Sequence, residues 1–282
     1  MVAELTHARL HPSHCMAPGL FKSLSKGTRK ARLFVSYPWG GNEIRFVGSE
    51  QLGADDMRFL QVIVALANFI GVRLGPEPAE EVQKQVRLGL AIDSNKILDA
   101  RMFSCRAGKL LGEAGMTDGG GNTNILKSSL KRMSSVSVAV RRKEAITSYQ
   151  MLSFIEGGAK QLHIAVNPLL ASAFENRASH TRIDLNEVRN LKSDAACLLH
   201  LRLCGFVDQR QPKRIGVDRL CSYAWGDGRA KPEVERKRRE RIRNAVRSLS
   251  DCGWVVSDDG PNQFQISRPA GKRPVTAVGR KW

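Results

Sequence analysis

Acidic residues are scarce in this chain of 282 residues. Asp and Glu total 27 against 45 Lys and Arg, which gives a formal net charge of +18 at pH 7. Such an excess favours a polyanionic partner, nucleic acid first and an anionic membrane surface second. No apolar run approaches the roughly 20 residues that span a bilayer, and no apolar signal-peptide core accompanies the N-terminal histidines. We therefore expect a cytoplasmic protein without a membrane partner.

The chain also lacks the residue spacings of metal and redox sites. Its six cysteines include no C-x-x-C pair and lie mostly in apolar periodic segments, as small buried residues do. His7, His11 and His14 precede Cys15, but a zinc site needs a second converging cluster, and the sequence shows none. We expect neither a bound metal nor another cofactor.

No set of residues typical of an active site assembles in the sequence. The run Asp118-Gly119-Gly120-Gly121 lacks the spacing of nucleotide-binding loops and predicts a turn. Asp55-Asp56 could ligate a metal in a nuclease or primase, but carboxylates at a helix start are the commoner explanation. A nicking enzyme would need a tyrosine nucleophile beside a histidine cluster, which is missing around Tyr37, Tyr149 and Tyr223. We predict that the protein is not an enzyme and has no catalytic residues.

The clearest positive feature is the segment KPEVERKRRERIRNAVRSL, from Lys231 to Leu249. At helical spacing its apolar residues Ile242 and Leu249 share one face, and Arg236, Arg243 and Arg247 lie opposite. A solvated charged helix is the usual explanation of a charge run, but the glutamates here do not balance the basic residues. Two strand patterns, 254–257 and 263–267, follow around a turn. A helix followed by a hairpin is typical of the end of a winged helix-turn-helix.

A similar order of patterns occurs in the first half. Helical patterns at 103–114 and 122–133 flank the glycine-rich turn, with Asn122 as the expected N-cap of the second helix. Strand patterns at 136–140 and 149–155 then predict a hairpin, which we interpret as a first wing with basic residues at its tip. The segment 53–68 predicts a core helix, whereas 82–99 shows no assignable pattern.

The sequence thus predicts an α+β protein with two tandem winged helix-turn-helix domains, although no sequence repeat is visible. Residues 1–50 are expected to form a basic N-terminal arm and a lead-in hairpin. Residues 51–176 would be the first winged-helix domain and 181–269 the second, joined by a short linker. Residues 270–282 are a basic tail that we expect to be disordered.

The outward faces of the two helices that precede the hairpins carry side chains suited to DNA. Arginine reads guanine, asparagine reads adenine, and lysine or serine contacts phosphates. The predicted DNA-binding residues are Asn124, Lys127, Ser128, Lys131 and Arg132 in the first helix, Arg141, Arg142 and Lys143 in the first wing, and Lys231, Arg236, Arg238, Arg239, Arg243 and Arg247 in the second helix. Two reader helices on one face of a duplex would sit roughly 10 to 10.5 base pairs apart. A monomer, or a weak dimer on DNA, could then read an asymmetric site such as a direct repeat.

Longer blocks of the sequence resemble the replication protein C initiators of IncQ-type broad-host-range plasmids. The blocks are HCMAPGLFKSL from His14, LGADDMRFLQ from Leu52, LGPEP from Leu74, LHIAVNPLLA from Leu162, LHLRLCGFVD from Leu199, IGVDRLCSYAW from Ile215 and RKRRERIRNAV from Arg236. The resemblance extends over about residues 5–269. It implies two winged-helix domains that bind direct repeats, called iterons, in double-stranded origin DNA. It also implies opening of an adjacent AT-rich region and cooperation with a plasmid-encoded helicase and primase. A transcriptional repressor that uses the same fold on a promoter is the alternative.

Overall fold

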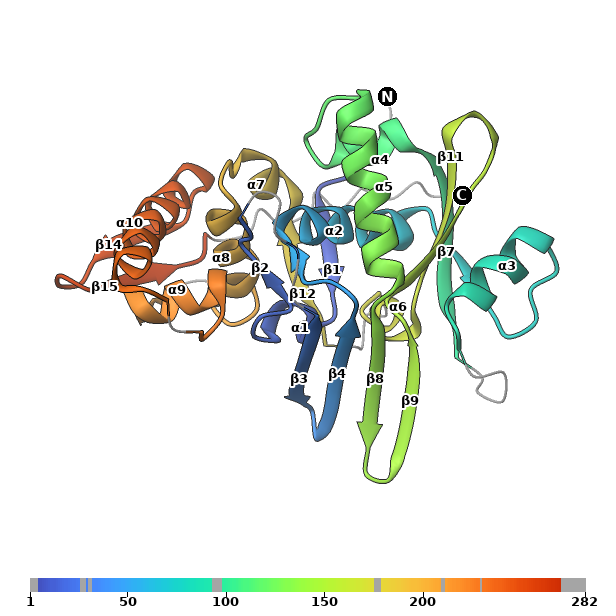
Figure 1. The fold of residues 1–282 in the computed structure, drawn as a ribbon, viewed down its shortest axis with the longest axis horizontal. Coiled ribbons are helices and arrows are strands. Elements are labelled where there is room, and N and C mark those ends of the chain that lie inside the picture. Colours follow the sequence, from blue (N-terminus) through green and yellow to red (C-terminus); the bar gives the residue numbers. More distant parts are fainter. Residues whose placement is uncertain are drawn as a thin grey trace, which may run out of the picture.

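The computed structural model describes residues 5–25, 29, 32–92, 98–174, 179–208, 211–228 and 230–269. The tail expected at 270–282 and most of the expected linker, 175–178, lie outside these residues. Two units of mixed helix and sheet lie side by side (Figure 1). Among the described residues, no helix combines the length and the apolar character needed to cross a membrane.

The first unit is built around α2 (Ala54–Phe69), a helix that is buried on most of its surface. The carboxylate of Asp56 caps its start by accepting a hydrogen bond of 2.7 Å from the backbone N–H of Gly53. Around α2 lie β6 (Val72–Leu74), α3 (Glu81–Gly89), β7 (Ala100–Arg106), α4 (Ala107–Glu113), α5 (Gly120–Ser134), β10 (Leu152–Glu156), the 3-10 turn η1 (Gly158–Lys160), β11 (Gln161–Val166) and α6 (Pro168–Ser172). The antiparallel sheet of this unit has the order β10-β11-β7-β6.

Two expectations for the helix pair of this unit are wrong. Residues 103–106 belong to strand β7, because they pair with β11 in the core sheet, and the first helix begins only at Ala107. Helix α5 begins at Gly120 with Gly119 as its N-cap. Asn122 does not cap it, since its side-chain amide donates a hydrogen bond of 2.8 Å to the carbonyl of Thr117.

Two hairpins distant in the sequence combine into a four-stranded antiparallel sheet, which we call the β-arm. Its strands are β3 (Leu33–Trp39), β4 (Asn42–Gly48), β8 (Ser137–Arg142) and β9 (Ala145–Gln150), in that order. The β-arm projects away from the body (Figure 1). Buried Phe46 and Val138 face each other across β4 and β8 and join the two hairpins at their base. The expected lead-in hairpin therefore exists, but as one half of this sheet.

The expected partner strand at 149–155 is wrong in its bounds. It is divided at Met151 between β9, which pairs with β8, and β10, which pairs with β11. The second strand of the hairpin starts at Ala145. The sequence did not indicate this start, because the side chains there are exposed on both faces and show no hydrophobic alternation.

The second unit is built around α8 (Asp194–Cys204), which the hydroxyl of Ser193 caps. The other elements are β12 (Thr181–Asp184), α7 (Leu185–Asn190), β13 (Lys213–Gly216), α9 (Val217–Trp225), α10 (Pro232–Ser248), the 3-10 turn η2 (Ser250–Cys252), β14 (Val255–Asp258) and β15 (Gln263–Ser267). Ile242, Ala245 and Val246 of α10 are buried, and the helix packs against α8 and α9. The helix and the hairpin predicted for this part of the chain are confirmed.

A buried ionic cluster joins α7, α8 and the start of the last hairpin. Fully buried His200 lies 2.6 Å from a carboxylate oxygen of Glu187, and the indole N–H of Trp254 donates to the same oxygen at 3.0 Å. Burial lowers the pKa of His200, but the adjacent Cys204 and the carboxylate of Glu187 raise it more strongly, to about 10. His200 thus has the structural role of holding three elements together.

The N-terminal segment connects the two units instead of forming a free arm. Strand β1 (His7–Leu10) pairs antiparallel with β12 of the second unit and packs on α2 of the first. Helix α1 (Pro12–Met16) packs on α8, and β2 (Phe21–Lys22) pairs in parallel with β5 (Leu52–Gly53). The expectation of an arm is wrong for residues 5–25, because apolar side chains of this segment, such as Leu10 and Leu20, are buried in the core.

The two units repeat one order of elements. In the first it is α2, β7, α4, α5, β10 and β11, with β6 and α3 added between α2 and β7; in the second it is α8, β13, α9, α10, β14 and β15. The strand pairing is also the same. In the first sheet β7 pairs with β11, and β11 pairs with β10; in the second sheet β13 pairs with β15, and β15 pairs with β14. The hairpin of β8 and β9 is an insertion between α5 and β10. The hairpin that corresponds to β14 and β15 is therefore the one formed by β10 and β11, and not the β8–β9 hairpin that follows α5 directly.

Candidate nucleic-acid interface

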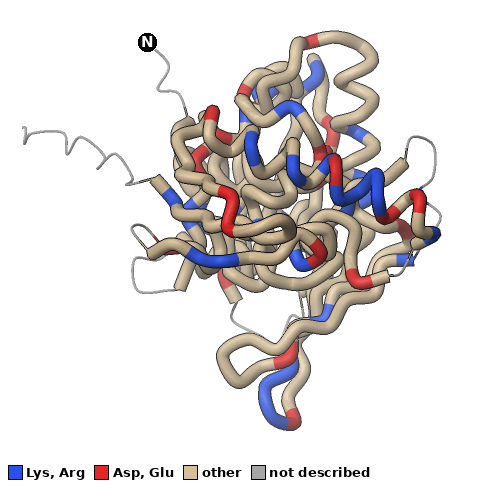
Figure 2. The backbone as a smooth tube through the Cα atoms, turned by 90° about the vertical axis from the view of Figure 1, so that its left-hand side faces the viewer, with Lys and Arg blue, Asp and Glu red and all other residues tan. Residues whose placement is uncertain are grey.

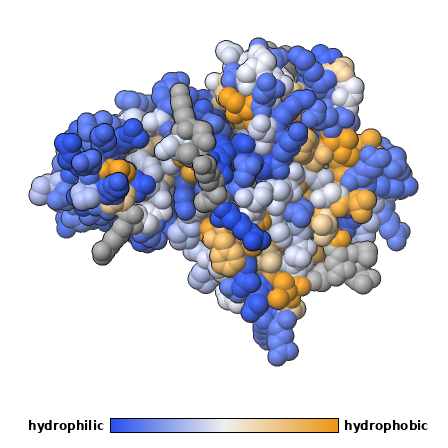
Figure 3. All heavy atoms as spheres, viewed as in Figure 1, coloured by the Kyte–Doolittle hydropathy of each residue, from blue (hydrophilic) through white to orange (hydrophobic). Residues whose placement is uncertain are grey.

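Helix α10 presents a row of cations to solvent. Pro232 occupies its favoured place in the first turn, and the buried stripe of Ile242, Ala245 and Val246 turns the opposite side of the helix outward. Arg236 and Arg247 on that side are exposed, as is Lys231 at the N-cap. Figure 2 shows the basic residues along this helix, and Figure 3 shows the hydrophilic surface over it. The sequence prediction for this face is confirmed in its geometry.

Three other arginines of α10 are held by neighbouring elements. Arg239 makes a two-pronged ion pair with Asp218 of α9, at 2.6 and 3.2 Å. Arg238 lies over the ring of Trp225, with 5.5 Å between the guanidinium carbon and the ring centroid. Arg243 donates to the side-chain oxygen of Asn262 at 2.9 Å, so the turn of the last hairpin is attached to the helix. These contacts fix the orientations of the guanidinium groups before any ligand binds.

Asn262 is a residue of this site that sequence analysis missed. It lies in the turn between β14 and β15, far from α10 in the chain. A helical wheel cannot find it, because only the folding of the hairpin against α10 brings it beside Arg243.

Helix α5 occupies in the first unit the place of α10 in the second. Leu126, Leu130 and Met133 are buried, and they leave Asn124, Ser128 and Lys131 exposed, as predicted. Lys127 is half-buried, and its ammonium group lies 2.5 Å from a carboxylate oxygen of Glu156, at the end of β10. The side chains available for recognition on this face are thus an amide, a hydroxyl and a lysine.

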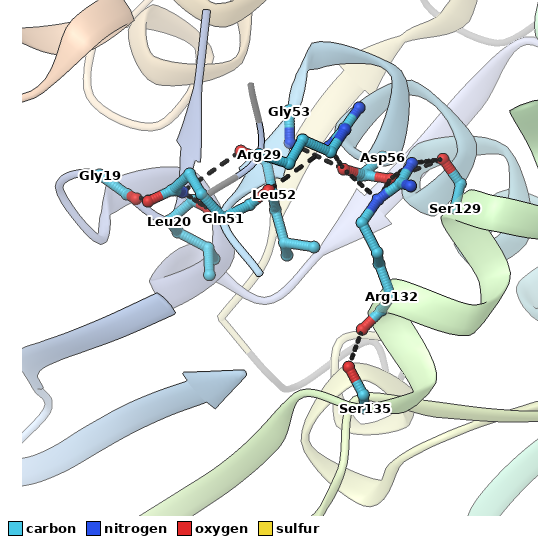
Figure 4. A network of polar contacts seen from close by, with 10 residues as sticks. All are labelled: Gly19, Leu20, Arg29, Gln51, Leu52, Gly53, Asp56, Ser129, Arg132 and Ser135. Carbon is cyan, nitrogen blue, oxygen red and sulfur yellow. Dashed lines mark hydrogen bonds and ion pairs between the residues drawn. The ribbon is translucent and has the colours of Figure 1, made fainter. Parts of the chain in front are cut away.

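Arg132 does not belong to the outward face, so the placement predicted for it beside the exposed cations of α5 is wrong. Its guanidinium donates to Asp56 at 2.8 and 3.1 Å, and only 13 % of its side chain is exposed (Figure 4). The physical reason is the complete burial of the Asp56 carboxylate, which requires a compensating charge. Helical spacing places Arg132 beside the core stripe but does not show the carboxylate below it.

Asp56 accepts further hydrogen bonds from two other parts of the chain. The hydroxyl of Ser129 on α5 donates to it at 2.5 Å, and Arg29, from the segment between β2 and β3, donates at 2.7 Å (Figure 4). The side chain of Arg29 is 27 % exposed. The explanation of Asp56 as a helix-start carboxylate is confirmed, and its second function is to fix α5 on α2.

The tip of the β-arm is basic. Arg142 and Lys143 are exposed there, and Lys143 adopts a left-handed conformation with φ of 54° in the turn. Arg141 lies 3.7 Å from Glu43, which faces it across β4 and β8. Hydrogen bonds from Ser36 and Arg45, and the charges of Arg45 and Arg141, lower the pKa of Glu43. The sequence showed Glu144 as the acidic neighbour of this tip, but sheet pairing also brings Glu43 to it.

Comparison with solved structures shows the same kind of fold. The chain is similar to domains 2 and 3 of RctB, with a TM-score of 0.53, 12 % identity and coverage of 90 % of this chain and 96 % of that one. A second structure of RctB domains 2-3 gives a TM-score of 0.52, 11 % identity and coverage of 88 % and 95 %. The Pi initiator protein, solved in complex with iteron DNA, gives a TM-score of 0.50 at 12 % identity, with 94 % of this chain and 97 % of that chain covered.

Sequence comparison identifies the family. No curated protein matches the chain significantly. The sequence model of Replication protein C (RepC), however, matches residues 2–270. Because this match extends over nearly the whole chain, the protein belongs to the replication protein C (RepC) family.

Proposed function

We propose that the protein is a plasmid replication initiator that binds direct repeats in double-stranded origin DNA through two winged helix-turn-helix units. The observation that carries the proposal is the repeated order of elements, with a polar, outward-facing helix, α5 or α10, at the same place in each unit. Membership of a replication protein family supports the role in replication. The similar Pi initiator was solved with iteron DNA, which supports the choice of ligand.

Helices α5 and α10 would be the reader helices, each entering a major groove. Phosphate neutralisation by the many exposed cations would supply most of the affinity, and a few contacts to base edges would supply the sequence preference. The pairing of β1 with β12 and of β2 with β5 ties the units together. A buried ion pair of 2.6 Å between Arg189 of α7 and Glu113 of α4 adds to this connection. A fixed separation of the readers suits two contacts about one helical turn apart, roughly 10 to 10.5 base pairs, on one face of the duplex.

Opening of the origin would follow from strain in the bound DNA. A monomer that holds two successive grooves in a fixed geometry bends or twists the duplex between them, at a cost that depends on its sequence. Several bound repeats would concentrate this strain on an adjacent AT-rich region and expose single strands for a helicase and a primase. In this role the protein acts without enzymatic activity.

Protection of origin DNA from cleavage tests the proposal. We expect the purified protein to protect a series of direct repeats beside an AT-rich segment, with contacts on one face of the duplex. A single protected promoter, without protection of repeats, would instead indicate a transcriptional repressor. Equal protection of any DNA would contradict sequence-specific binding altogether.

A further inference from the structure

The turn between β10 and β11 carries a lysine that belongs neither to the face of a reader helix nor to the β-arm. Residues 156–160, with the sequence EGGAK, are all exposed. Their hairpin has the same place in its sheet as the hairpin of β14 and β15 in the second unit. The turn is thus the counterpart of the turn whose Asn262 contacts α10.

The first turn is attached to its reader helix in a comparable way. Lys127 of α5 forms its ion pair with Glu156, the last residue of β10, as Arg243 of α10 bonds to Asn262. Figure 1 shows the hairpin that contains β11 running beside α5 in the direction opposite to the β-arm. The β10–β11 turn therefore lies next to the outward face of α5.

Local contacts give this turn a defined shape. Ala159 and Lys160 both adopt left-handed conformations, with φ of 54° and 60°, and the backbone N–H of Gly157 donates to the carbonyl of Gln161 at 2.8 Å. The ring of His163 packs against Gly157, since a Cβ placed on that glycine would lie 3.1 Å from its Nε2. The other ring nitrogen of His163 is bonded to Ser104 on the neighbouring strand at 2.7 Å.

A second cation lies at the same end of the sheet. Arg106, the last residue of β7, faces Gln161 across the strand pair, so it is a close neighbour of the turn. Arg106 and Lys160 are both exposed, and neither has an ion-pair partner among the residues that the structure describes. In the second unit the corresponding turn carries Asp258 and Asp259, and Asp259 is paired with Arg214 at 3.0 Å. The two turns therefore differ in charge although they share a topology.

We propose that Lys160 and Arg106 form a phosphate-binding site of the first unit, which holds the DNA backbone beside the groove that α5 enters. The site rests on the proposed function and adds to it: the first unit grips the backbone with the turn of its last hairpin, whereas the acidic turn of the second unit does not. The β-arm, whose β8–β9 hairpin follows the opposite end of α5, is not needed for this grip.

The salt dependence of DNA binding tests the site. Wild-type protein, Lys160→Gln and Arg106→Gln would be titrated onto an origin duplex and a random duplex of equal length, at several salt concentrations. Lys84→Gln is the matched control, because Lys84 is an exposed cation on α3, away from both reader helices. The logarithm of the binding constant falls linearly as the logarithm of the salt concentration rises. A protein that neutralises one phosphate fewer on B-DNA has a slope that is less steep by about 0.9.

We expect Lys160→Gln and Arg106→Gln each to make the slope less steep by about 0.9 on both duplexes. Lys84→Gln should keep the wild-type slope. Wild-type slopes in the first two variants would overturn the site. An equal decrease in Lys84→Gln would also overturn it, because the effect would then be one of net charge. Failure of the proposed function is distinguishable, since wild-type protein would then show no preference for the origin duplex, while the random duplex would still test the phosphate site.

Discussion

Replacing Asp56 with Ala should destabilise the first unit strongly and release helix α5. The carboxylate is fully buried, and it accepts hydrogen bonds from the Gly53 backbone, the Ser129 hydroxyl and the guanidinium groups of Arg29 and Arg132. Without it, Arg29 and Arg132, whose side chains are 27 % and 13 % exposed, would lose this buried counter-charge.

The magnitude follows from the burial of this ion pair. Removing one partner of a buried pair costs about 3 to 5 kcal/mol, because it leaves uncompensated charge in a medium of low polarity. For chains of 150–250 residues, each kcal/mol lowers the melting temperature by about 2 to 4 °C, so a decrease of about 6 to 20 °C is expected. The adjacent Asp55 is the matched control, because it occupies the same first turn of α2 without any of these contacts. Asp55→Ala should cost only the interaction with the helix dipole, about 0.3 to 1 kcal/mol.

Thermal and urea unfolding of both variants would measure the difference, and binding to an origin duplex would report on α5. We expect Asp56→Ala to lose stability and affinity together, and Asp55→Ala to lose at most about 1 kcal/mol of stability and to keep its affinity. Melting temperatures that agree within a degree or two would refute the reasoning, since Asp56 would then not hold α5 on α2. Arg132→Ala should also cost more than Arg29→Ala, because Arg132 makes more hydrogen bonds to Asp56 and is less exposed.

Three further predictions concern the reader helix, the β-arm and the buried histidine. Arg236→Ala should weaken binding to cognate DNA by about 1 to 3 kcal/mol if Arg236 reads a base, and equal weakening on random DNA would reassign it to a phosphate. Neutralising residues 141–143 should make the salt dependence of binding less steep by about 0.9 for each phosphate contact that is lost. Because Glu43 competes for Arg141, we expect a decrease that corresponds to two phosphates and not three. An unchanged slope would mean that the tip does not touch DNA. The pKa of His200 is raised from 6.5 to about 10 in the folded protein, so its stabilising contribution is complete below pH 6.5 and is lost as the pH rises through about 10. Urea unfolding between pH 7 and 10 should therefore show a loss of stability that His200→Gln diminishes, and equal pH dependence of both proteins would contradict this.

The sequence by itself indicated the class of partner and predicted the last helix and the last hairpin of the second unit. The excess of 18 positive charges favours a polyanion, and α10 and the last hairpin were predicted within a few residues. These elements are local: the apolar stripe of α10 repeats within one helix, and β14 and β15 are joined by a short turn. Patterns that repeat over a few residues need no knowledge of the rest of the chain. The sequence blocks also indicated the family, which comparison with the RepC family confirms.

Only the tertiary structure decided which strands pair and which cations remain free. The sequence showed a hairpin after α5, but the pairing of β8 with β4 assigns it to the β-arm, and β10 and β11 take its expected place. Helical spacing placed both Arg132 and Arg236 outside the apolar stripe of their helices, but Arg132 lies over a buried carboxylate whereas Arg236 is exposed to solvent. Strand pairing and ion pairing are contacts between residues far apart in the chain, so local periodicity carries no record of them. They are fixed when buried charge finds compensation and buried backbone finds hydrogen-bond partners, which happens only in the folded protein.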